Sequence, residues 1–153
     1  FDHFMGIMKF LISKYQNEIK DLVSLKNDTV FDGKGCHVVV FNNPHFKYIE
    51  HKVKEGENLF EIAAKNKISE YMILEKNKII DNYFDISMGQ KITIPNDYAP
   101  KMVLYIDKNL NLPLVIEVYD DKDFYERYEY RKLEFNPIIT DEEFTTEYKD
   151  YDF

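Results

Sequence analysis

Residues 51–95 read HKVKEGENLFEIAAKNKISEYMILEKNKIIDNYFDISMGQKITIP, and this stretch has the clearest pattern of helices and strands in the chain. Two helical patterns lie between two short strand patterns. Asn58 is a good N-cap for the first helix, and Glu61, three residues later, completes a capping-box pattern. Ser69 caps a second helix, which Asn77 ends. A glycine turn then leads into the strand KITIP, so the stretch predicts a compact βααβ unit.

This stretch resembles the LysM module, a small βααβ unit. The matching positions run over its whole length and are Val53, Gly56, Glu57, Asn58, Leu59, Ile62, Ala63, Ser69, Ile73, Asn77, Ile86, Gly89, Gln90, Ile92, Ile94 and Pro95. The resemblance implies binding of glycans that contain N-acetylglucosamine, such as peptidoglycan or chitin, in a shallow groove between two loops. Carried over by position, the glycan-binding residues would be Gly56, Glu57, Asn58 and Leu59 on one side and Ile80, Asp81 and Asn82 on the other.

The groove departs from the usual LysM pattern at two places. Glu57-Asn58 stand where Asp-Thr is common, and Tyr83-Phe84 are bulky. An acetamido group needs backbone partners and a small apolar seat, and an open groove binds each sugar weakly. Two interpretations follow: the module binds sugar, or its fold is kept as a spacer or protein-interaction surface.

The flanking segments predict one curved antiparallel sheet with a helix, so the expected fold class is α+β. Residues 4–24 repeat apolar side chains at three- and four-residue steps, which is the period of an amphipathic helix. Strands are predicted at 36–42, 46–53, 101–107, 113–120 and 124–135. Short turns favour antiparallel neighbours, and the βααβ unit is expected to be inserted between two strands of this sheet.

Residues 98–144 resemble an uncharacterised family of secreted bacterial proteins related to the LolA/LolB lipoprotein carriers. The resemblance is carried by the order of Tyr105-Ile106-Asp107, Leu112-Pro113, Glu117-Val118-Tyr119-Asp120, Tyr128-Glu129-Tyr130 and Asn136-Pro137. It implies a half-barrel whose concave apolar face holds acyl chains. The lipid-facing residues would be Met102, Leu104, Ile106, Leu114, Ile116, Val118, Tyr128 and Tyr130. Alternatively, these side chains pack against the helix predicted over 4–24.

The predicted domain organisation is discontinuous. Residues 1–50 and 96–153 would form the LolA/LolB-like half-barrel, and residues 51–95 the LysM module. The chain starts at Phe1 rather than Met, and no signal peptide is visible. We therefore expect a processed or partial polypeptide, in which the half-barrel could lack its first strands.

Charge and composition exclude several classes of protein. The 153 residues carry a net charge of −8, without the basic stripe that nucleic acids or anionic lipid surfaces require. No apolar run approaches the ~20 residues that span a bilayer. Cys36 is the single cysteine, so an intrachain disulfide is excluded, and its place in a strand predicts burial.

Catalytic and metal-binding patterns are missing from the sequence. His3, His37, His45 and His51 have no compact ligand spacing, and no GxSxG, P-loop or GxGxxG motif occurs. Glu126 and Glu129 fall on opposite faces of their strand. The sequence predicts neither an enzyme, nor a cofactor, nor a metal site.

The favoured hypothesis is a non-enzymatic protein of the periplasm or cell envelope. Its LysM module would bind peptidoglycan while the half-barrel binds a lipid, a lipoprotein or a protein partner. A second hypothesis is a subunit of a larger envelope assembly, in which the module contacts protein. A third is a periplasmic lipid or lipoprotein carrier without glycan binding.

Overall fold

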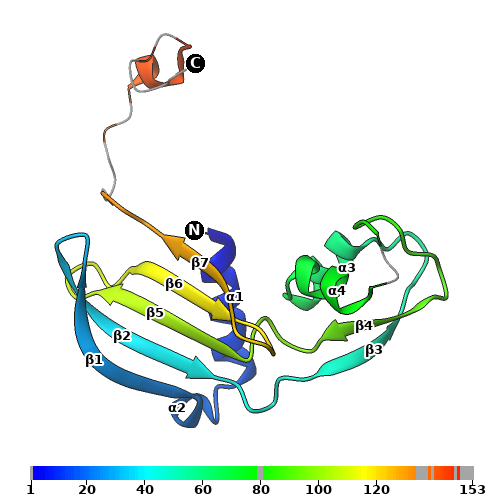
Figure 1. The fold of residues 1–153 in the computed structure, drawn as a ribbon. Helices are drawn as coiled ribbons and strands as arrows, with labels where there is room; N and C mark the ends of the chain where they lie inside the picture. Colours follow the sequence, from blue (N-terminus) through cyan, green and yellow to red (C-terminus); the bar gives the residue numbers. More distant parts are fainter. Residues whose placement is uncertain (1, 79–80, 134–137, 139, 147, 149–153) are drawn as a thin grey trace.

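The chain folds as an α+β protein with two antiparallel sheets (Figure 1). The computed structural model describes residues 2–78, 81–133, 138, 140–146 and 148. The larger sheet has five strands in the order β1-β2-β5-β6-β7, and the smaller pairs β3 with β4. In the part of the chain that is described, the larger sheet is curved and open, with β1 and β7 as its edges, and it does not close into a barrel.

The strands of the larger sheet follow the prediction with one addition and one omission, since the strand predicted over 46–53 lies in the smaller sheet as β3. Their bounds are β1 Val23–Phe31, β2 Lys34–Asn42, β5 Lys101–Asp107, β6 Pro113–Tyr119 and β7 Phe124–Glu129. β2, β5 and β6 confirm the predicted strands, whereas β7 ends at Glu129 rather than at 135, of which 134–135 lie outside the described residues. β1 was not predicted.

The helix predicted over 4–24 is wrong in its second half. α1 spans Asp2–Lys14, the short α2 spans Ile19–Leu22, and the chain then extends as β1. The helical spacing of apolar residues continues past the true end because Ile19 and Leu22 belong to α2. β1 itself exposes most of its side chains, so it shows little apolar alternation, and pairing with β2 makes it a strand.

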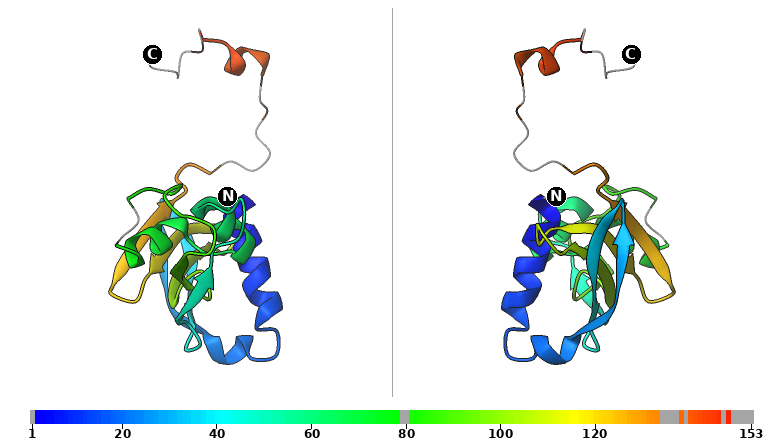
Figure 2. Two further views of the ribbon diagram at one scale, coloured as in Figure 1. Left: turned by 90° about the vertical axis from the view of Figure 1, so that its right-hand side faces the viewer. Right: turned by 90° about the vertical axis from the view of Figure 1, so that its left-hand side faces the viewer.

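One buried cluster joins α1 to the sheet. Figure 2 shows α1 lying across one face of the sheet. The apolar stripe of α1 supplies Phe4, Ile7 and Leu11, and the sheet supplies Phe41, Met102, Leu104, Ile116 and Val118. Burial of this apolar surface is the main favourable term in folding of this part of the chain. Cys36 is buried in β2, as predicted, and burial raises the pKa of its thiol.

The βααβ unit has a core of its own. It consists of β3 Tyr48–Lys52, α3 Leu59–Asn66, α4 Glu70–Lys76 and β4 Lys91–Pro95. Its buried residues are Val53, Leu59, Ile62, Ala63, Ile68, Ile73, Ile92 and Ile94. This confirms the two helices and the last strand predicted between 51 and 95, whereas the first strand begins earlier, at Tyr48.

The βααβ unit lies between two neighbouring strands of the larger sheet. β2 pairs with β5, and the unit occupies the connection between them. The N–H of Asn43 donates to the carbonyl of Pro100 at 2.7 Å, which brings the two ends of the connection together. Met72 of α4 is buried in the same cluster as Tyr98 and Met102, so the unit is docked on the sheet.

The described residues 140–146 lie away from both sheets (Figure 1). They include one short 3-10 helix, η1, at Asp141–Phe144. Across the described residues, no helix combines the length and the apolar character that a membrane span requires.

Candidate functional site

The residues predicted to form the groove belong to two loops, the one before α3 and the one between α4 and β4. Asn58 begins α3 as a full capping box: its Oδ1 accepts the N–H of Glu61 at 3.0 Å, and its own N–H donates to Glu61 Oε2 at 3.1 Å. The N–H of Leu59 donates to the carbonyl of Tyr83 at 3.0 Å. This backbone bond ties the two loops to one another.

Glu57 is a fixed carboxylate rather than a freely moving one. Its Oε2 accepts the N–H of Lys54 at 3.0 Å and lies 2.9 Å from His51 Nε2. These two hydrogen bonds, the backbone one first, hold the pKa of Glu57 below its ordinary value of 4.5. Gly56 has φ +76°, a conformation that favours glycine, so the turn before Glu57 depends on that residue.

Leu59 differs from the other predicted groove residues of the first loop because its side chain points into the core. The Leu59 side chain is fully buried in the core of the unit, so its backbone alone lies at the groove. Asn58 is half-buried and its carbonyl side-chain oxygen is used by the cap. The first side of the predicted groove is therefore made of backbone and polar groups.

The second loop supplies Asp81 and Asn82, both exposed. Asn82 shapes the turn, because its Oδ1 accepts the N–H of Phe84 at 2.9 Å and its carbonyl accepts the N–H of Asp85. Ile80, the third predicted residue on this side, lies outside the described residues.

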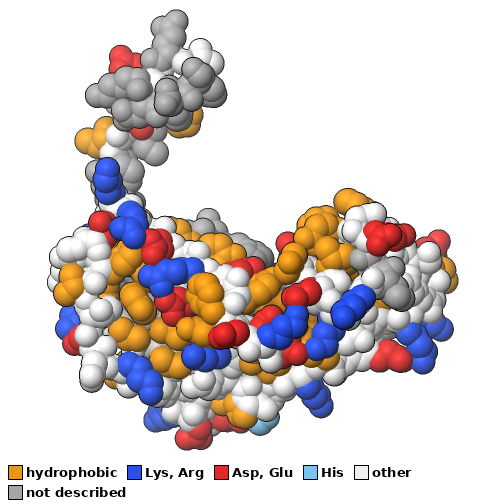
Figure 3. All heavy atoms as spheres, viewed as in Figure 1, with side chains coloured by type: hydrophobic (Ala, Val, Ile, Leu, Met, Phe, Trp, Pro, Cys, Tyr) orange, Lys and Arg blue, Asp and Glu red, His pale blue; other side chains and the backbone are white. Residues whose placement is uncertain are grey.

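An aromatic cluster beside these loops was not foreseen as part of the site. The Phe60 ring lies 4.7 Å from that of Tyr83 and 5.7 Å from that of Phe84, centroid to centroid. Phe60 is 43% exposed and Phe84 68% exposed, although both are large and apolar. Figure 3 shows hydrophobic side chains gathered over α3 and the loop before β4. The available sequence signal was Phe60 itself, an aromatic residue on the polar side of its helix.

Six of the eight predicted lipid-facing residues pack in or against the cluster that α1 fills. Met102, Leu104, Ile116 and Val118 belong to the cluster that α1 fills, and Ile106 and Tyr130 pack against it. Leu114 is buried, whereas Tyr128 is 43% exposed. This arrangement is the alternative named above, in which the face packs on a helix. Binding of acyl chains there stays a prediction, and it would require α1 to move.

The histidines each have a local partner where the structure describes their side chains. His37 pairs with Asp28, His45 with Glu18 and His51 with Glu57. Among the described residues, no group of three or more His, Cys, Asp or Glu side chains is arranged to hold a metal ion.

Comparison with known families identifies the βααβ unit. Residues 51–95 match the family model of the LysM domain, so the chain contains a LysM domain at these positions. LysM domains are carbohydrate-binding modules that generally bind glycans containing N-acetylglucosamine, such as peptidoglycan, and they occur in extracellular or cell-envelope proteins. Comparison with curated proteins and with solved structures found no match, and the LolA/LolB-like resemblance of the flanks stays a prediction.

Proposed function

We propose that this protein binds N-acetylglucosamine-containing glycan, peptidoglycan first among them, through its LysM domain and that it acts at the cell envelope. The observation that carries the proposal is the family match over 51–95 together with the folding of that stretch into the expected βααβ unit. The binding residues are Gly56, Glu57 and Asn58 in one loop and Asp81 and Asn82 in the other.

The chemistry of the two loops supports a sugar ligand. Turns expose backbone N–H and carbonyl groups, which can pair with an acetamido group. The exposed carboxylate of Asp81 accepts hydrogen bonds from sugar hydroxyls. Phe60 and Phe84 offer exposed ring faces against which the C–H face of a sugar can pack.

The preorganised turn at Glu57 also supports the proposal. The loop enters binding already fixed by the bonds from Lys54 and His51, so little conformational entropy is lost when a ligand arrives. Affinity for each sugar stays modest because the groove is open. One LysM domain therefore predicts weak binding to a short oligosaccharide and stronger retention on a polymer that offers many sites.

Binding is tested with chitotetraose in solution and with insoluble peptidoglycan in a co-sedimentation assay. Phe60→Ala should weaken chitotetraose binding about threefold to tenfold, because it removes an exposed aromatic contact of about 1 kcal/mol. Asp81→Ala should weaken it by a similar factor through loss of a charged acceptor.

Matched controls lie in η1, away from the LysM domain (Figure 1). Phe144→Ala removes an aromatic side chain that is 79% exposed, and Glu142→Ala removes an exposed carboxylate. Both controls should bind like the unaltered protein. No binding of chitotetraose and no pelleting with peptidoglycan by the unaltered chain would refute the proposal.

A further inference from the structure

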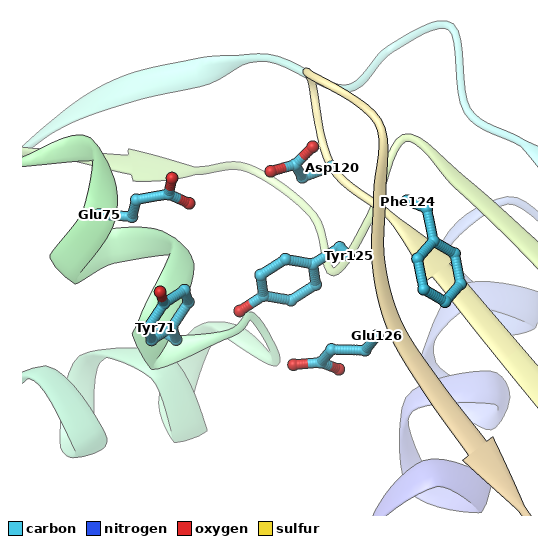
Figure 4. A pocket seen from close by; sticks show the side chains of 6 residues that line it. All are labelled: Tyr71, Glu75, Asp120, Phe124, Tyr125 and Glu126. Carbon is cyan, nitrogen blue, oxygen red and sulfur yellow. The ribbon is translucent and has the colours of Figure 1, made fainter.

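A recess lies between the LysM domain and the β6–β7 hairpin. Its volume is about 550 Å³, and its lining residues are Tyr71, Glu75, Asp120, Phe124, Tyr125 and Glu126. Figure 3 shows the surface hollowed between the two parts of the molecule. In Figure 4, the side chains of Tyr71 and Tyr125 point toward one another across this cleft, with three carboxylates around them.

The two walls of the cleft are fixed to each other at its edges. Lys122 of the hairpin pairs with Glu75 of α4, and Lys76 pairs with Asp121 at 2.8 Å. Ser69 Oγ lies 3.2 Å from the hydroxyl of Tyr125. Together with the buried packing of Met72 against the larger sheet, these contacts fix the two walls relative to one another, which lowers the entropic cost of binding.

The charges that line the cleft favour a cation. Glu75, Asp120 and Glu126 contribute three carboxylates, and none of the six lining residues is basic. At the edge, Lys76 pairs with Asp121 and Lys122 with Glu75, so among the described residues Asp120 and Glu126 are the cleft carboxylates that no lysine pairs with. A concave surface with such an excess of one sign concentrates ions of the other sign.

The tyrosine rings that line the cleft indicate which kind of cation it would favour. Tyr71 is 48% exposed, and its ring lies 5.8 Å from that of Tyr125. Aromatic faces attract a cation and also pack against apolar carbon, so they suit an ammonium group at the end of an alkyl chain.

The protein already holds a primary ammonium in this way beside the cleft. The Nζ of Lys76 lies 4.0 Å from the centroid of the Tyr48 ring while it pairs with Asp121. The cleft itself combines a tyrosine ring with a carboxylate at Tyr125 and Glu126 of β7, whereas Glu75 beside Tyr71 is already paired with Lys122.

We infer that the cleft binds a primary ammonium group on a short alkyl chain. This group would belong to the peptides of the peptidoglycan that the LysM domain binds. Peptidoglycan strands bear short peptides, and a peptide that is not cross-linked carries a free side-chain amine. Tyr71 and Glu75 of the cleft belong to α4 of the LysM domain, so the cleft and the proposed glycan-binding loops share that domain. This inference rests on the proposed function.

The experiment compares four probes by calorimetric titration of the full chain. They are a disaccharide-tetrapeptide fragment of peptidoglycan with a free lysine amine, the same fragment acetylated at that amine, chitotetraose, and a tetralysine peptide. The free-amine fragment should bind about tenfold more tightly than the acetylated fragment, which corresponds to one charged contact supported by aromatic rings. This difference should shrink at high salt.

Glu126 Oε2 accepts a hydrogen bond from the hydroxyl of Tyr128 at 2.8 Å, and glutamine keeps an acceptor at that place. Glu126→Gln is therefore the test variant. It should remove most of the tenfold difference and leave chitotetraose binding unchanged. Glu142→Gln, which makes the same charge change in η1, should alter neither.

The outcomes separate this inference from the proposed function. Equal binding of the two fragments, or weak binding of both, overturns the inference whatever chitotetraose does. A preference for the free-amine fragment without binding of chitotetraose supports the inference about the cleft and refutes glycan binding by the two loops. Tetralysine binding that exceeds that of the free-amine fragment would show that the cleft serves a basic protein segment, and it would overturn the assignment to peptidoglycan.

Discussion

At the scale of single residues, Glu57 decides the shape of the first groove loop. A carboxylate with a lowered pKa stabilises the fold while it is ionised, since the folded state binds its proton less tightly than the unfolded chain does. The stabilisation is present above the ordinary pKa of 4.5 and is lost as pH falls through the lower folded-state pKa. Acid should therefore loosen this loop.

Glu57→Gln should lower the free energy of unfolding by about 1 kcal/mol at neutral pH, through weaker hydrogen bonds to Lys54 and His51. The gap between the two proteins should narrow as pH falls below 4.5, because glutamine does not titrate. Urea unfolding at several pH values measures this gap. Glu55→Gln, an exposed neighbour, is the control. A gap that stays constant with pH would contradict the assignment.

At the scale of elements, Asn77 does more than end α4. Its Nδ2 donates to the carbonyls of Ile73 and Thr93, each at 2.7 Å, and its Oδ1 accepts the N–H of Thr93 at 2.8 Å. The side chain thus pairs with β4 as a short piece of strand would. The sequence identified Asn77 as a helix stop, and this bridge to β4 was visible only in the fold.

Asn77→Ala should destabilise the protein by about 2 to 3 kcal/mol, since three partly buried hydrogen bonds are lost and backbone groups are left unpaired. Asn66→Ala is the matched control, because Asn66 makes one comparable bond, to the carbonyl of Ile62 at 2.7 Å. It should cost about 1 kcal/mol. Equal losses in chemical denaturation would mean that the bridge to β4 adds nothing.

The elements also show what local sequence can and cannot predict. The caps at Asn58 and Ser69 were predicted correctly because a cap depends on residues within three positions of it. β1 was missed because its exposed side chains show no apolar alternation, although the turn Asp32-Gly33, with both residues at positive φ, joins it directly to β2 as a hairpin. The aromatic cluster at Phe60 was missed for a different reason, since it forms only when the second loop folds over α3.

At the scale of the whole molecule, a buried methionine of the LysM domain, Met72, packs against the larger sheet. Met72 is 2% exposed and comes from α4, yet it packs in the cluster of Tyr98, Ala99 and Met102 rather than in the core of its own domain. The ion pairs at the edge of the cleft are partly exposed and add little. Apolar contact therefore holds the two parts together.

Met72→Ala should lower the free energy of unfolding by about 3 kcal/mol, because it leaves a cavity between the two parts. Met88→Ala changes a methionine that is 73% exposed and should have almost no effect. Thermal and urea denaturation followed by circular dichroism measure both. Similar small losses in the two variants would show that the LysM domain is not anchored by Met72.

The link between Asn43 and Pro100 bears on how the molecule would respond to tension. The chain leaves β2 at Asn42 and returns at Lys101, and these two residues face each other at one end of the sheet. A pull transmitted from a wall polymer through the LysM domain would run along both strands at once. The ladders to β1 and β6 would then resist in shear, with many hydrogen bonds sharing the force, instead of unzipping one by one.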